Sequence, residues 1–114
     1  MTDRVLIIGG GPAGLEAANQ LNLLGYKPVI VEKDDTLGGH LAKWDRLFPE
    51  GESAETVLYK LIKPVEHTPV YLNTIVEKAD KEGNNFRVKL SGGKEEIVSA
   101  ILVCAGFSLS PAEK

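Results

Sequence analysis

This chain has little of several residue types that point to particular functions. Its 114 residues include one cysteine, Cys104, which excludes an internal disulfide and a Cys-x-x-Cys redox pair within the chain. Lys and Arg total 13 against 16 Asp and Glu, and no basic run occurs, so the charge pattern does not predict binding to nucleic acid. The apolar runs 5–15 and 100–107 are too short and too glycine-rich to span a bilayer. We therefore expect no direct membrane insertion.

The first residues, MTDRVLII, pass directly into a strand-like run and lack the charged, apolar and cleavage regions of a secretory signal. A cytoplasmic location is the expectation that follows. Hydrophobic residues make up 43% of the chain and charged residues 25%, which is ordinary for a globular protein. A chain of this length builds one modest core. We expect one domain over residues 1–114.

The chain opens with a strand–helix–strand pattern. Residues 4–8 form a continuous apolar run, typical of a strand buried on both faces of a parallel sheet. A helix is expected over 12–24, because Pro12 suits the first helical position and Gly25 can end the helix in a left-handed conformation. Residues 28–32 predict a second strand. Together these segments predict a βαβ unit with a right-handed crossover.

The middle of the chain predicts a second helix and a third parallel strand. The helix is expected over 53–63, where Ser53 can cap it and Pro64 should stop it. Residues 69–72 then predict the strand. Up to this point the pattern indicates an α/β fold with a parallel sheet.

Residues 73–99 change character and predict a three-stranded antiparallel β-meander. Three short strand-like pieces are separated by turn sequences at 81–84 and 91–94. Within 86–90, apolar and basic residues alternate, which indicates one buried and one solvated face. The run 100–106 is again an apolar strand, so the meander replaces a helix as the crossover, and a tail over 107–114 follows.

The strongest motif is the glycine spacing Gly9-x-Gly11-x-x-Gly14 between the first strand and the first helix. Gly9 permits a tight turn, Gly11 lets the backbone approach a pyrophosphate, and Gly14 allows the helix to pack closely on the sheet. Pro12 and Ala13 lie at the helix start, where free N–H groups can meet the anionic pyrophosphate. The motif alone is weak evidence, but it stands in the βαβ context that the dinucleotide-binding fingerprint requires.

Glu32 supplies the acidic residue of the same fingerprint. It stands at the end of the second predicted strand, 18 positions after Gly14, close to the spacing of about 20 that the fingerprint expects. Its carboxylate can accept hydrogen bonds from both ribose hydroxyls and would repel a 2′-phosphate, which favours FAD or NAD over NADP. In the alternative interpretation the glycines only form a strand–helix turn and Glu32 is a solvated strand end. The coincidence of several independent features favours the nucleotide site.

Residues 5–41 resemble the N-terminal FAD-binding motif of flavoproteins with two dinucleotide-binding domains, a group that includes the pyridine nucleotide–disulfide oxidoreductases. In that group the fingerprint extends to a Gly-Gly pair, matched here by Gly38 and Gly39. The meander crossover also resembles theirs, and residues 104–106 stand where their strand-end Ala-Thr-Gly motif lies, with Gly106 kept. The resemblance implies a Rossmann-like FAD/NAD(P)-binding fold and FAD as cofactor, with NAD the weaker expectation.

The same resemblance implies roles for individual residues. Glu32 and the glycines of the fingerprint would contact FAD, Gly38 and Gly39 would lie near its phosphates or ribityl chain, and Lys33 beside its adenosine half. Val76 would offer its backbone to the adenine. For His40, a position near the flavin or phosphates and a structural hydrogen bond in a loop are both open. The expected cofactor-binding residues are Gly9, Gly11, Pro12, Ala13, Gly14, Glu32, Lys33, Gly38, Gly39, His40, Val76 and Gly106; no catalytic residue or metal ligand set stands out.

Residues 31–49 show a closer likeness, to the A-subunits of heterodisulfide reductases and the flavoprotein subunits of quinone-interacting oxidoreductase complexes. In those proteins a Gly-Gly-His pattern leads to a Phe-Pro, as it does here at Phe48 and Pro49. Several of them place cysteines just after the Phe-Pro. Residues 50–60 contain none, so iron–sulfur or thiol chemistry there is not expected.

In this flavoprotein group the FAD domain is discontinuous, so the chain looks like a truncated first portion of a larger domain. The expected function is to hold the ADP half of FAD in an FAD-dependent oxidoreductase, with other subunits of an electron-transfer complex as candidate partners. Two alternatives remain at this point. One is a stand-alone module that binds NAD or an adenine nucleotide without catalysis, and the other is the same fold without a ligand.

Overall fold

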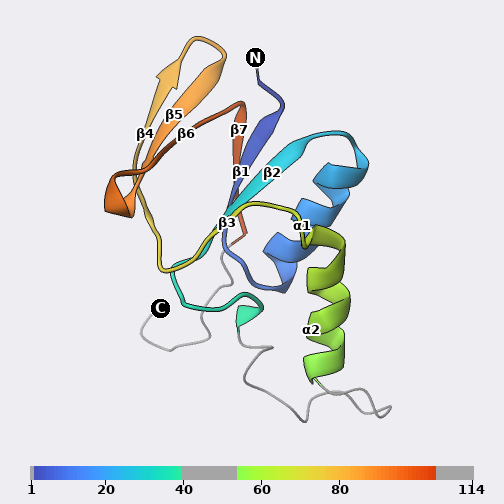
Figure 1. Ribbon diagram of the computed structural model, residues 1–114. Coiled ribbons are helices and arrows are strands. Elements are labelled where there is room, and N and C mark those ends of the chain that lie inside the picture. Colours follow the sequence, from blue (N-terminus) through green and yellow to red (C-terminus); the bar gives the residue numbers. More distant parts are fainter. Residues whose placement is uncertain (1, 40–53, 105–114) are drawn as a thin grey trace, which may run out of the picture.

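The computed structural model describes residues 2–39 and 54–104, which form two sheets and two α-helices (Figure 1). One sheet is parallel, with strand order β3-β2-β1-β7, and the other is antiparallel, with order β4-β5-β6. The elements in chain order are β1 (Arg4–Ile8), α1 (Pro12–Leu23), β2 (Lys27–Val31), α2 (Ala54–Ile62), β3 (Val70–Tyr71), β4 (Val76–Glu82), β5 (Asn85–Leu90), β6 (Glu95–Val98) and β7 (Ala100–Val103). The expected α/β architecture, with a meander between parallel strands, is confirmed.

The parallel sheet is covered on both faces, which explains its continuous apolar strands. Side chains alternate along each strand, so Leu6 and Ile7 of β1 point to opposite faces. Leu6 packs with Val29 and Val31 of β2 against buried residues of the meander, which are Val88, Leu90 and Val98. Ile7 packs with Ile30 against α1 and the turn after α2, through Leu15, Ala18 and Val65. The parallel sheet therefore lies between the helices and the meander.

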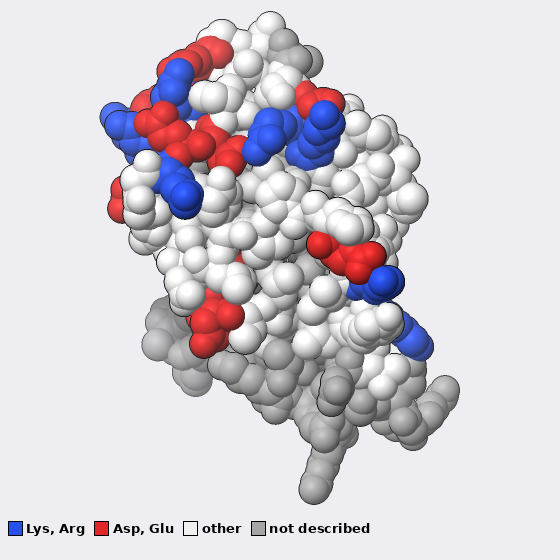
Figure 2. Space-filling view, in the orientation of Figure 1, with Lys and Arg blue, Asp and Glu red and all other residues white. Residues whose placement is uncertain are grey.

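The outer face of the meander is charged, as its alternating sequence predicts. Figure 2 shows Lys, Arg, Asp and Glu side chains gathered over this sheet. Arg87 on β5 binds Glu82 on β4 at 2.6 Å and Glu95 on β6 at 3.0 Å, so one guanidinium joins all three strands. These pairs are solvent-exposed, and exposed pairs contribute little to stability.

The second helix and the third parallel strand both end earlier than predicted. The second helix ends at Ile62, and the chain continues through Pro64 in a single 3-10 turn, Lys63–Val65. Proline is tolerated in the first turn of a helix, where its missing N–H has no partner to lose. The strand expected over 69–72 is only Val70–Tyr71.

The last strand also differs from the prediction. β7 lies at one edge of the parallel sheet, and two of its apolar side chains are exposed, Leu102 by 38% and Val103 by 73%. β7 is therefore less buried than the inner strands β1 and β2, and Cys104, directly after it, is half-buried and packs against the core. The rest of the predicted strand and the tail over 107–114 lie outside the described residues.

Among residues 2–39 and 54–104, neither helix is long and apolar enough to cross a membrane.

Candidate functional site

The loop between β1 and α1 has a conformation that requires glycine at two positions. Gly9 has φ of 118°, in the region that L side chains rarely adopt. A Cβ atom added to Gly14 would overlap the carbonyl oxygen of Gly9. The turn at Gly9 and the close packing of α1 therefore depend on each other, as the fingerprint predicts.

Gly11 differs from these two glycines because its backbone would accept any residue. It has φ of −80° and ψ of −171°, which is ordinary extended backbone. A Cβ atom added here would meet no described atom within 4 Å. The space beside Gly11 lies at the start of α1, where exposed Pro12 and Ala13 begin the helix and the first N–H groups have no intrahelical acceptor. A phosphate can approach the backbone at this position.

Glu32 follows β2 directly and its carboxylate is fixed by backbone donors. The residue is 6% exposed. Its Oε1 accepts the Gly10 N–H at 2.6 Å, and its Oε2 accepts the Asp34 N–H at 2.8 Å. A carboxylate offers about four acceptor positions, so about two remain for hydroxyl donors. Among the described residues no Lys or Arg side chain forms an ion pair with it.

Gly10 was not among the residues expected from the sequence, yet the position of Glu32 depends on it. A Cβ atom on Gly10 would lie 2.6 Å from Leu37 Cδ2 and 3.2 Å from Glu32 Oε1. A larger residue at position 10 would therefore require the Leu37 and Glu32 side chains to shift. The available signal was the unbroken run of three glycines at 9–11, of which the fingerprint uses only the first and third.

The Gly-Gly pair at 38 and 39 serves two purposes. Both residues have positive φ, 98° and 54°. Gly38 donates its N–H to the Gly10 carbonyl at 2.6 Å, and a Cβ atom on it would overlap Leu58 of α2. Gly39 lies over the loop instead, where its Cβ atom would be 3.6 Å from the Gly11 Cα. Gly38 is thus needed for packing, and Gly39 borders the space beside Gly11.

Of the other expected residues, the structure describes Lys33 and Val76. Lys33 is exposed directly after Glu32. Val76 begins β4, pairs with Leu90 and is partly buried against the core. The segment between β3 and β4 contacts the candidate site, because the Thr74 N–H donates to the Glu32 carbonyl at 3.0 Å. His40 and Gly106 lie outside the described residues.

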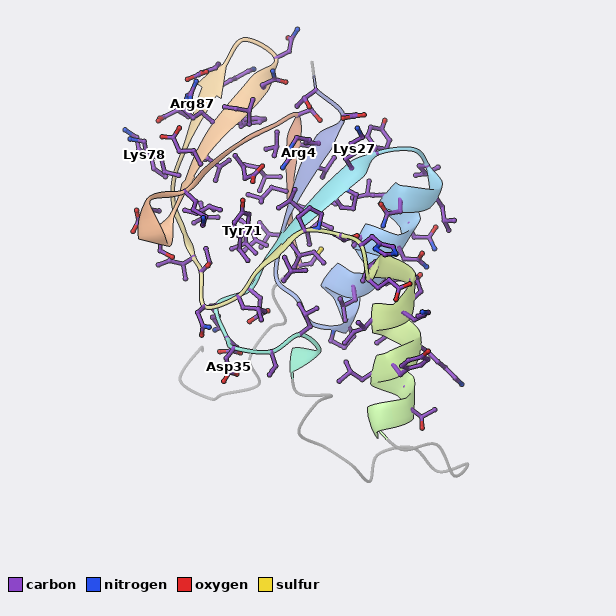
Figure 3. All side chains as sticks on the ribbon, in the orientation of Figure 1. Arg4, Lys27, Asp35, Tyr71, Lys78 and Arg87 are labelled. Atoms are coloured by element: carbon purple, nitrogen blue, oxygen red, sulfur yellow. The ribbon has the colours of Figure 1, made fainter. Side chains whose placement is uncertain are left out.

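A surface pocket of about 380 Å³ lies at the opposite end of the parallel strands from the glycine loop. Its lining includes Arg4, Lys27, His67 and Thr68, at the amino ends of β1 and β2 and before β3. Figure 3 shows Arg4 and Lys27 at this end and Asp35, after β2, at the other. Ligands of open α/β sheets bind at the carboxyl ends of the strands, so the glycine loop is the candidate site. No group of His, Cys, Asp and Glu that could hold a metal ion occurs within the part of the chain that the structure describes.

Comparison with known proteins agrees with this geometry. The profile of the NAD(P)-binding Rossmann-like domain matches residues 7–71, more than half of the chain, from β1 to β3. The chain belongs to this family. The matched segment of the Rossmann-like domain contains the glycine loop, Glu32 and the Gly-Gly pair, and the family implies a nucleotide or flavin cofactor.

The relatives of this Rossmann-like domain confirm the expected likeness to heterodisulfide reductases. The chain is 34% identical to the iron–sulfur A-subunit 2 of the CoB–CoM heterodisulfide reductase of Methanopyrus kandleri over 79% of its length. It is 40% identical over 75% of its length to the iron–sulfur A-subunit of the same enzyme in Methanocaldococcus jannaschii. It spans 14% and 13% of those two proteins.

A solved structure has the same fold over nearly the whole chain. The flavoprotein disulfide reductase RclA of Escherichia coli aligns with 96% of this chain, which covers 22% of that protein, with a TM-score of 0.66 and 24% identity. This likeness shows the fold alone. The structural alignment covers almost the whole chain, so it includes the meander as well as the segment 7–71 that the family profile matches.

Proposed function

We propose that this chain is the FAD-binding portion of an FAD-dependent oxidoreductase and that it holds the ADP half of FAD. The observation that carries the proposal is the Glu32 carboxylate, buried and fixed by two backbone N–H groups beside the glycine loop. Its free acceptor positions suit the two ribose hydroxyls, and the open space at Gly11 suits the pyrophosphate.

Three features support FAD over NAD. The Gly-Gly pair extends the fingerprint as in the flavoproteins that the sequence resembles, and Gly39 borders the phosphate space. A meander, rather than a helix, connects β3 and β7. A protein with this fold, RclA, is named a flavoprotein. The carboxylate of Glu32 would repel a 2′-phosphate, which argues against NADP.

In this proposal residues 1–114 form the N-terminal portion of one FAD-binding domain, with 73–99 as its meander. FAD supplies electron or hydride transfer in the whole protein, and this chain's residues bind and orient the cofactor. Other subunits of an electron-transfer complex are proposed partners, since the relatives are named as subunits. The proposed cofactor-binding residues are Gly9, Gly11, Pro12, Ala13, Gly14, Glu32, Lys33, Gly38, Gly39, His40, Val76 and Gly106.

A ligand titration of the 114-residue chain tests the proposal. FAD, ADP, NAD and NADP are each titrated by calorimetry, and the visible spectrum of the purified chain is recorded for bound flavin. We expect FAD and ADP to bind, NAD to bind more weakly than FAD, and NADP to bind most weakly. A preference for NAD over FAD would support the stand-alone NAD-binding module instead. Absence of binding by all four compounds would refute both functions.

A further inference from the structure

Three polar side chains from different strands meet between the two sheets. The Arg4 guanidinium on β1 donates through Nη2 to Glu96 Oε1 at 2.5 Å, and the Tyr71 hydroxyl on β3 donates to Glu96 Oε2 at 2.6 Å. Glu96 itself lies on β6 of the meander. Figure 3 labels Arg4 and Tyr71 on their strands. We refer to these three residues as the Glu96 cluster.

Within the Glu96 cluster, Glu96 is buried, whereas Arg4 and Tyr71 are partly exposed. Glu96 is 8% exposed, and each of its carboxylate oxygens accepts a hydrogen bond. A buried carboxylate without partners is costly, so these bonds fix its position. The hydrogen bond to Glu96, together with burial, raises the pKa of Tyr71 above its usual value. The Tyr71 hydroxyl therefore keeps its proton near neutral pH and remains the donor.

Tyr71 also contacts the candidate nucleotide site through its backbone. Its carbonyl accepts the Glu32 N–H at 2.8 Å. β3 is only two residues long and pairs with β2 through Val70 and Tyr71 alone. So short a strand has few backbone bonds to hold it, and the side chain of Tyr71 supplies an additional anchor to Glu96. The same residue thus joins the meander to the backbone of Glu32.

We propose that Glu96 is a positioning residue for the nucleotide site. The Glu96 carboxylate fixes the Tyr71 side chain. The Tyr71 carbonyl in turn fixes the position of the Glu32 backbone, so that the Glu32 carboxylate can reach the ribose. Glu96 does not touch the nucleotide in this arrangement. The inference rests on the proposed function, because it assigns the Glu96 cluster to the binding of the ADP half of the cofactor.

The test compares ADP with 2′-deoxy-ADP, because the two ligands differ only in a hydroxyl that Glu32 is proposed to bind. We expect the 114-residue chain to bind ADP about fivefold more tightly than 2′-deoxy-ADP, as one hydrogen bond would give. In Tyr71→Phe and in Glu96→Ala, each of which removes the hydrogen bond between residues 71 and 96, that ratio should fall to about twofold or less. Phe keeps the ring that packs on the core and removes only the hydroxyl. The matched control is Tyr59→Phe on α2, where the side chain is 64% exposed, and its ratio should equal that of the unmodified chain.

A purely structural role would lower the affinity for both ligands by the same factor and leave the ratio unchanged. That result in a folded Tyr71→Phe variant would overturn the proposal. Hydrogen exchange at the Glu32 amide gives a ligand-free check, and we expect faster exchange in Tyr71→Phe than in Tyr59→Phe. Equal exchange in the two variants would also overturn it. If the unmodified chain binds neither ligand, the proposed function fails, and the positioning role fails with it whatever the exchange rates are.

Discussion

Two buried carboxylates lie in the part of the chain that the structure describes, and they are held in opposite ways. Glu32 is bound by backbone N–H groups of Gly10 and Asp34. Glu96 is bound by the side chains of Arg4 and Tyr71. A carboxylate that faces only neutral donors keeps its charge uncompensated and can still accept ligand hydroxyls, whereas one paired with arginine is neutralised. Burial alone therefore does not distinguish the carboxylate proposed to bind ribose from the other one, whereas the nature of the partners does.

The largest expected effect concerns the glycine loop, whose backbone binds Glu32. Gly14→Ala forces a Cβ atom into the Gly9 carbonyl, and we expect the free energy of unfolding to fall by about 3 kcal/mol, since the backbone must shift. Gly11→Ala is the matched control, with open space and ordinary φ, and should change stability by about 0.5 kcal/mol or less. Urea denaturation of both variants measures the difference. Similar losses in the two would show that the loop is not packed as described.

A smaller effect should separate the two carboxylates directly. In Glu32→Gln the new amide must point a donor at either the Gly10 or the Asp34 N–H, and neither can turn into an acceptor. In Glu96→Gln the Tyr71 hydroxyl can accept instead of donate. We expect a loss of about 2 kcal/mol for Glu32→Gln and about 1 kcal/mol for Glu96→Gln. Denaturation of the two variants at pH 7 tests the order, and the reverse order would contradict the assigned partners.

The smallest expected effect is a loss of stability at alkaline pH. It arises from the hydrogen bond between Tyr71 and Glu96 and has no counterpart at Glu32, which is bound by backbone N–H groups. The pKa of Tyr71 is raised in the folded chain above its usual value of 10.0. Its contribution to stability is therefore complete below about pH 10 and is lost as the pH rises through the folded pKa. The stability advantage of the unmodified chain over Tyr71→Phe should stay constant from pH 7 to pH 9 and shrink above pH 10. An advantage that stays constant above pH 10 would show that the hydroxyl does not bind Glu96.

The two carboxylates also differ in how far the sequence predicts them. The loop and Glu32 were predictable because backbone geometry demands glycine at Gly9 and Gly14 at a fixed spacing from an acidic strand end. The Glu96 cluster was not predictable, because its members are separated by 92 and 25 positions along the chain and no local pattern relates them. Gly10 was missed because its role depends on where the Glu32 side chain turns.

The fold, too, has features that the sequence predicts and features that it does not. Hydrophobic runs and alternation predicted the parallel strands and the meander, since both patterns reflect burial on two faces or on one. They could not predict that β7 would expose Leu102 and Val103, because an apolar strand has the same sequence at an edge as at the centre of a sheet. Strand position is a property of the whole sheet.

The most direct test of the proposed site is the FAD affinity of the unmodified chain and of Gly11→Val, measured side by side. A Cβ atom at this position would meet no described atom within 4 Å, and the backbone there is extended, so we expect the circular dichroism spectrum of Gly11→Val to match that of the unmodified chain. The valine side chain would fill the space proposed for the pyrophosphate. We predict FAD binding by the unmodified chain and binding at least about tenfold weaker in Gly11→Val, equivalent to about 1.4 kcal/mol. Equal FAD affinity in the two proteins would contradict the proposed site.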